Sequence, residues 1–155
     1  MSPDKLAPKS FQQRVEGILS KLHDSLGRPY LPRREFKASA LHWPDVVWFD
    51  GRLPDRLTRS GLPGVPVVAF EVESSSSLQS IKAAINNLEA LKPALGCIVI
   101  PARVAAKGRT IETEKYGKTV GEAMQYLASR SSLAIKVLTD KELEAMIPSP
   151  KRRNG

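Results

Sequence analysis

The stretch that most constrains the fold runs from Val65 to Glu73 and reads VPVVAFEVE. Its first part is apolar at consecutive positions, which is typical of a strand that lies inside a sheet and is covered on both faces. Side chains alternate between the two faces of a strand, so we expect Glu71 and Glu73 on one face and Val72 on the other. The stretch therefore predicts a central strand that delivers two carboxylates at its carboxyl end, where open α/β sheets tend to place their sites.

A third carboxylate comes from the segment HWPDVVWFDG, which predicts a strand over 46–49 with Asp45 just before it. Strands that are neighbours in sequence are usually neighbours in a sheet, so Asp45 is expected near Glu71 and Glu73. Two carboxylates about 5 Å apart repel by about 3 kcal/mol at an effective dielectric near 20, which calls for a compensating cation or a raised pKa. Hard oxygen ligands suit Mg²⁺ or Mn²⁺. The alternative, acids at a solvated strand end without a metal, stays open.

The remaining periodicities predict the other elements of an α/β fold. Apolar residues at helical spacing indicate helices over 10–26, 77–92, 119–128 and 139–147. Extended segments are expected over 30–40, 46–49, 65–73, 96–100 and 133–138. This order predicts one mixed α/β domain over residues 10–147, preceded by a flexible arm over 1–9 and followed by a basic, disordered tail over 148–155.

Composition narrows the classes of function. The chain has 155 residues and a formal net charge of +8, which is consistent with an anionic partner, most commonly nucleic acid, and equally with a generally basic soluble protein. The single cysteine, Cys97, excludes an internal disulfide framework and a cysteine zinc cluster. No apolar run approaches the roughly 20 residues of a membrane helix, and the first residues lack the apolar segment of a signal peptide. We therefore expect a soluble cytoplasmic protein with no membrane partner.

The order of the acidic motifs resembles that of a known superfamily. Pro44–Asp45, followed by Glu71-Val72-Glu73 on an apolar strand that leads into a helix, resembles the PD-(D/E)xK nuclease superfamily over roughly residues 10–101. The resemblance implies a restriction endonuclease-like three-layer α/β/α sandwich with a mixed central sheet.

The resemblance also implies roles for individual residues. Asp45 and Glu71 would hold a divalent metal together with the carbonyl of Val72. Glu16, on the leading helix, is similar to an acid that sometimes binds the metal through water. Glu73 stands where a lysine is common, although some restriction endonucleases of this superfamily carry a glutamate there. In other members the lysine has moved onto the following helix, and Lys82 could serve in that way.

The activity that the resemblance implies is Mg²⁺- or Mn²⁺-dependent hydrolysis of phosphodiester bonds in DNA by an endonuclease, which could act as a homodimer. Ser75 and Gln79 would help to position the substrate. Basic side chains would hold the flanking phosphates, and the candidates are Arg33, Arg34, Arg52, Arg56 and Arg59, with Arg103, Lys107 and Arg109 further along the chain.

Two other functions remain open. One is a nucleic-acid-binding module without turnover, which the glutamate at position 73 favours. The other is an interaction subunit of a larger defence or repair system.

Overall fold

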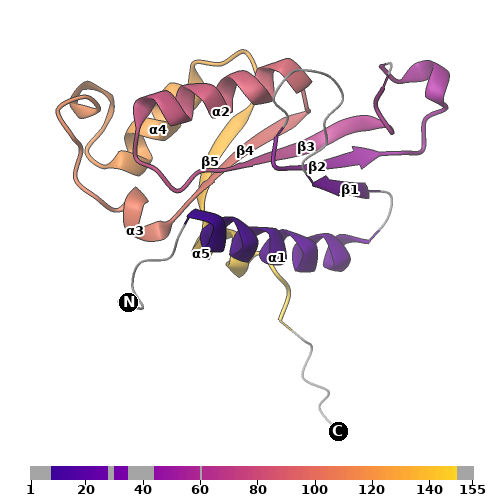
Figure 1. Cartoon of the computed structure of the whole chain (residues 1–155), viewed down its shortest axis with the longest axis horizontal. Helices are drawn as coiled ribbons and strands as arrows, with labels where there is room; N and C mark the ends of the chain where they lie inside the picture. Colours follow the sequence, from indigo (N-terminus) through magenta and orange to yellow (C-terminus); the bar gives the residue numbers. More distant parts are fainter. Residues whose placement is uncertain (1–7, 28–29, 35–43, 60, 150–155) are drawn as a thin grey trace, which may run out of the picture.

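The computed structural model describes residues 8–27, 30–34, 44–59 and 61–149, and its strands form one five-stranded sheet in the order β1-β2-β3-β4-β5 (Figure 1). The first three strands pair antiparallel, whereas β3, β4 and β5 pair parallel, so the sheet is mixed and β3 is central. The strands are β1 (Tyr30–Arg34), β2 (Val46–Asp50), β3 (Val65–Val72), β4 (Leu95–Ile100) and β5 (Ile135–Thr139).

Helices cover both faces of this sheet and make a three-layer α/β/α arrangement (Figure 1). One face is covered by α1 (Pro8–Leu26) and the short α5 (Asp140–Ala145). The other is covered by α2 (Leu78–Leu91) and α4 (Val120–Ser129). The connections contain α3 (Ala102–Ala105) and two 3₁₀ turns, η1 (Asp55–Leu57) and η2 (Glu114–Tyr116).

The alternation of side chains along β3 divides the core into two clusters. Ala69 packs with the residues of α2 and α4, whereas Phe70 packs with those of α1 and α5. In β2, Val47 belongs to the first cluster and Trp48 to the second. The predicted central strand, apolar on both faces, is therefore confirmed, and the odd-numbered positions of β2 and β3 share the α2 face.

Local signals explain where the helices end. The first helix stops at Gly27, whose φ of +71° is the left-handed conformation that glycine adopts without strain, and whose N–H donates to the His23 carbonyl. The second helix begins after Ser77, whose hydroxyl accepts a hydrogen bond from the Ser80 N–H. The start of α1 differs from the prediction: it lies at Pro8, where proline fits the first turn of a helix, two residues before the predicted start.

The predicted helices and strands are confirmed in type and order, with the short α3 as an addition. The predicted extended segment over 30–40 is a strand as far as Arg34, and residues 35–40 lie outside the described residues. The same holds for residues 1–7 of the predicted arm and 150–155 of the predicted tail. Within the described ranges, no helix is long and apolar enough to cross a membrane.

Candidate active site at the carboxyl end of β3

The sheet register brings Asp45 and Glu71 to the same place. Val46 pairs with Phe70, so the next residue outward on β2, Asp45, faces Glu71 on β3. Glu71 lies on the α2 face, where Val47 and Ala69 also point, whereas Asp45 lies just before β2 and reaches both the end of β3 and Gln12 on α1. Because β4 and β5 run parallel to β3, this end of the sheet carries the carboxyl ends of all three strands. The expected meeting of these two acids is present.

Asp45 is held by hydrogen bonds from two elements. Its Oδ2 accepts from the backbone N–H of Val72 at 2.7 Å, and its Oδ1 accepts from the Gln12 side-chain amide at 3.2 Å. The same amide nitrogen of Gln12 donates to Glu16 Oε1 at 3.3 Å, one helical turn further along α1. The acid of the leading helix is therefore linked to Asp45 through one glutamine.

Glu71 is a buried carboxyl group, 8% exposed, and its Oε1 accepts a hydrogen bond from the Asn87 side chain on α2 at 3.0 Å. Burial, and after it the charge of Asp45, raise the pKa of Glu71 to about 8, and the bond from Asn87 opposes this shift. The charge of Glu73 and a hydrogen bond between the Asp45 and Glu71 carboxyl groups also favour the neutral form. At neutral pH, Glu71 therefore carries a proton and shares it with Asp45.

Glu73 lies half-buried just beyond the end of β3. Its backbone N–H donates to the Val99 carbonyl at 2.9 Å, which carries the parallel ladder one residue further. Its Oε1 accepts from the Ser75 N–H at 3.0 Å, and the Ser75 hydroxyl accepts from the Ser77 N–H at 3.0 Å. The serine run is therefore an ordered turn that fixes Glu73 and starts α2, and in it Ser75 lies next to the acids, as expected.

The donor chemistry of Asp45 and Glu71 suits a small hard cation, but the side chains do not form a complete metal cage. Among the residues that the structure describes, no group of three or more His, Cys, Asp and Glu side chains is arranged to hold a metal ion. Mg²⁺ is commonly bound by one or two carboxylates, with water and substrate phosphates as its other ligands. Asp45 and Glu71, which share a proton, therefore suit Mg²⁺ better than a cation whose ligands must all come from the protein.

Lys82 and Gln79, the predicted site residues on α2, are both exposed. The charges that shift the pKa of Glu71 are those of Asp45 and Glu73 and do not include Lys82. The α2 side chain that reaches Glu71 is instead Asn87. A lysine role at Lys82 therefore stays a prediction without a contact that supports it.

The arginines predicted to hold phosphates fall at two different ends of the sheet. Arg52, Arg56 and Arg59 lie in the connection from β2 to β3, at the end opposite the acids. Six residues of β3, at about 3.3 Å each, place this end about 20 Å from Glu71. Arg52 pairs with Asp50 at 2.7 Å, and Arg59 donates to the Leu91 carbonyl. These three side chains therefore do not lie beside the acids, and their contact with the flanking phosphates stays a prediction.

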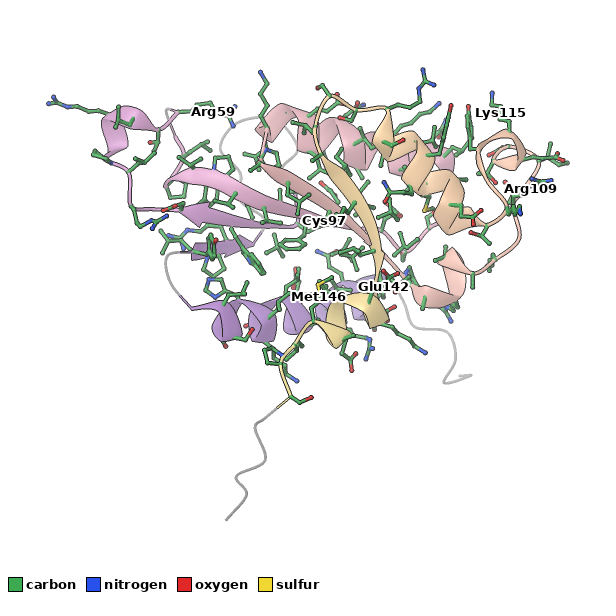
Figure 2. All side chains as sticks on the ribbon, turned by 180° about the vertical axis from the view of Figure 1, so that it is seen from behind. Arg59, Cys97, Arg109, Lys115, Glu142 and Met146 are labelled. Atoms are coloured by element: carbon green, nitrogen blue, oxygen red, sulfur yellow. The ribbon has the colours of Figure 1, made fainter. Side chains whose placement is uncertain are left out.

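Other basic residues do lie at the acid end. Arg33 pairs with Val47, so its exposed side chain is on the same face as Val47 and Glu71. Arg34 follows it on β1, and its side chain lies outside what the structure describes. The connection after β4 leaves from the acid end with Arg103, Lys107 and Arg109. Figure 2 shows Arg109 and Lys115 at one extremity of the molecule and Arg59 at the other.

Sequence reasoning missed Gln12 and Asn87, the two amides that hold the acids. Gln12 precedes Glu16 by four residues, a spacing that places both on one face of a helix and could have indicated the pair. Asn87 had no comparable signal, because which side of α2 faces the sheet depends on tertiary packing.

The chain was also compared with known proteins. No protein family, no curated protein sequence and no solved structure matches it closely enough to indicate a relationship. Arguments about function therefore rest on the geometry of the site.

Proposed function

We propose that this protein is a Mg²⁺- or Mn²⁺-dependent nuclease that hydrolyses phosphodiester bonds of DNA at the carboxyl end of β3. The observation that carries the proposal is the buried pair of Asp45 and Glu71. A buried acid next to a second acid is unfavourable for stability, and strongly perturbed carboxyl groups of this kind concentrate at functional sites. A divalent cation that replaced the shared proton would relieve both the burial and the repulsion.

The fold supports a restriction endonuclease-like assignment within the α/β class. The chain forms a leading helix, three antiparallel strands, a helix and a parallel strand, which is the order that the resemblance to the PD-(D/E)xK superfamily implies. Glu16 on the leading helix lies near Asp45, because the same Gln12 amide donates to both carboxylates. The formal net charge of +8 favours a polyanionic substrate.

In this proposal, Asp45, Glu71 and the Val72 carbonyl would hold the metal ion. When bound, the ion would polarise the scissile phosphate and lower the pKa of a coordinated water. Glu73, fixed by the Ser75 N–H, would orient the attacking water and accept its proton. Gln12 and Asn87 would keep the two metal-binding carboxylates in place.

The test is cleavage of duplex plasmid and single-stranded DNA by purified protein with Mg²⁺, with Mn²⁺ or with a chelator. We expect cleavage only with a metal, and a loss of at least about 100-fold in Glu71→Gln, because a neutral amide cannot replace a carboxylate ligand. The matched control is Glu112→Gln, which makes the same change at an exposed glutamate and should cleave like the wild type. Equal activity in Glu71→Gln and Glu112→Gln would remove the site from the proposal.

A nucleic-acid-binding module without turnover is the second candidate. Two observations favour it: among the residues that the structure describes, no lysine or arginine shifts the pKa of Glu71, and the cation usual at position 73 is replaced by an acid. Titration calorimetry separates the two candidates. Salt-dependent binding of DNA by a protein that takes up neither Mg²⁺ nor Mn²⁺ would support the binding module, because its affinity would come from phosphate contacts alone.

A further inference from the structure

A small cleft opens at the same end of the sheet, on the face opposite to Glu71. It has a volume of about 250 Å³. Each parallel strand contributes residues that directly follow its carboxyl end: Ser74 after β3, Pro101–Arg103 after β4, and Asp140 with Lys141 after β5. Ligands of open α/β sheets bind in crevices outside the carboxyl ends of strands. Figure 1 shows the start of α1, α3 and α5 gathered at this end.

The charges on the walls of the cleft favour an anion. Its lining includes three cationic residues, Arg14, Arg103 and Lys141, and one anionic residue, Asp140. Arg14 also pairs with Glu144, so the formal charge of these five residues is 3 − 2 = +1. Asp140 is already neutralised, because its Oδ1 accepts from the Ala102 N–H at 3.0 Å and its Oδ2 accepts from Arg14 Nε at 3.4 Å. Through these hydrogen bonds, Asp140 connects α5 to α1 and α3 around the cleft.

The guanidinium of Arg14 keeps donors for a ligand. Its Nε bonds to Asp140 and its Nη2 bonds to Glu144 on α5 at 2.8 Å, which uses two of its five N–H groups. These bonds hold the planar group at the wall of the cleft, and a pre-positioned guanidinium suits a phosphate. Phe11 and Pro101 supply buried apolar wall. Charges next to apolar wall interact more strongly than charges in open water.

A second cleft is larger, but its charged residues do not suit an anionic ligand. It has a volume of about 560 Å³ and lies between α1 and the first two strands. Among the described residues that line it, the charged ones are Glu16 and Asp24, with no lysine or arginine. A phosphate would be repelled there. The smaller cleft is the one whose charge matches an anionic ligand.

The smaller cleft also lies next to the acids along the chain. Ser74, in its wall, directly follows Glu73, and the end of β3 separates the cleft from Glu71. We propose that this cleft is an anion subsite that holds a phosphate group of the nucleic-acid strand, beside the phosphodiester bond that lies at the acids. The assignment of the second phosphate to the acids rests on the proposed nuclease function. The cleft itself requires only that the ligand carry a phosphate.

The first experiment needs no variant. Wild-type protein is titrated with inorganic phosphate, then with 5′-phosphorylated and 5′-hydroxyl single-stranded oligonucleotides, while backbone amide resonances are followed by NMR in the presence of a chelator. We expect saturable shifts at Ser74, Ala102 and Lys141. Equal shifts with both oligonucleotides identify a backbone phosphate, and larger shifts with the phosphorylated one identify a terminal phosphate. Shifts spread evenly over exposed basic residues, with none concentrated at the cleft, would overturn the proposal.

The second experiment measures DNA affinity against salt concentration without metal. Arg103→Gln with Lys141→Gln is compared with the matched pair Arg130→Gln with Lys136→Gln, which removes the same charge from exposed positions elsewhere. We expect the cleft pair to weaken binding about tenfold and to reduce the salt slope by about one, as the loss of a phosphate contact does. An unchanged slope in the cleft pair, or the same loss in both pairs, overturns the subsite. Unfolding temperatures show that both pairs fold.

The same proteins separate this inference from the proposed function. If the wild type cleaves DNA with metal but the cleft pair binds with an unchanged slope, the subsite fails and the nuclease stands. If the wild type never cleaves but the cleft pair loses the phosphate contact, the nuclease fails and the cleft remains a phosphate site in a binding module.

Discussion

At the carboxyl end of β3 the carboxyl group of Glu71 is buried beside a second acid, whereas at its amino end Arg52 is exposed and pairs with the partly exposed Asp50. Glu71 is 8% exposed and has Asp45 and Asn87 as partners. At the other end, Arg52 pairs with Asp50 on the surface, beside the exposed Leu57. Burial of a charge has a free-energy cost that exposure does not have, so only the first end calls for an explanation by function.

The largest expected difference between the two ends is in how the free energy of unfolding depends on pH. The pKa of Glu71 is 4.5 in its ordinary state and about 8 in the folded protein. Between these values the folded protein holds a proton on Glu71 that the unfolded chain has released, so the contribution of Glu71 to the free energy of unfolding is fully present below pH 4.5 and is lost by about pH 8. At about 1.4 kcal/mol per pH unit the loss amounts to several kcal/mol. Urea unfolding at a series of pH values measures it.

Glu71→Gln should flatten this profile and be more stable than the wild type above pH 8, since an amide carries no proton to lose. Glu112→Gln, an exposed control, should keep the wild-type slope. Addition of Mg²⁺ at high pH should stabilise the wild type and leave Glu71→Gln unchanged, because a ligand stabilises only the state that binds it. A wild-type profile that is as flat as that of Glu71→Gln would show that the carboxyl group is not desolvated.

Much of this end of the molecule follows from sequence patterns that are local. The apolar run before Glu71 predicts a central strand, and strict alternation then places Glu71 and Glu73 on one face. Adjacent strands usually pair, so the meeting with Asp45 also follows. These inferences needed no knowledge of how helices pack.

The sequence already indicates that Arg52 and the arginines after it lie far from the acids, and this indication was missed. Asp45 precedes β2 and Arg52 follows it, so the two lie at opposite ends of one strand, whatever the rest of the chain does. A loop that leaves the end of β2 and enters the start of β3 cannot be beside the carboxyl end of β3. The order of a residue and a strand in the sequence shows at which end of the strand the residue lies. Closeness in sequence to the strand does not.

Asn87 illustrates what a sequence pattern cannot supply. Asn86 and Asn87 are neighbours on α2, and both fit a polar helix face. The rotation of α2 is set by the packing of its apolar stripe against the sheet, and this rotation turns Asn87 toward Glu71 and leaves Asn86 in solvent. Helix rotation is a tertiary property, so the amide that holds the buried acid becomes visible only in the folded structure.

The two asparagines give a smaller test of the comparison. Asn87→Ala removes the donor to Glu71, leaves the carboxyl group with one partner fewer and should reduce the free energy of unfolding by about 1–2 kcal/mol. Because this bond opposes the upward shift, the pKa of Glu71 should rise further. Urea unfolding and NMR titration of the carboxyl carbon measure the two effects. Asn86→Ala, its exposed neighbour, should change neither, and an equal response of both variants would mean that Asn87 does not hold Glu71.

The smallest effect is expected at the amino end of β3. Hydrogen bonds from Arg52 lower the pKa of Asp50, so Arg52→Gln should return this pKa toward its ordinary value without a measurable change in stability, because both groups are exposed to water and screened by salt. DNA cleavage should also be unchanged, since this pair lies about 20 Å from Glu71. Arg33→Gln, at the acid end, is the comparison variant and should weaken DNA binding several-fold. If Arg52→Gln weakened binding more than Arg33→Gln, the substrate would extend along the whole sheet, and the amino end of β3 would be part of the binding surface.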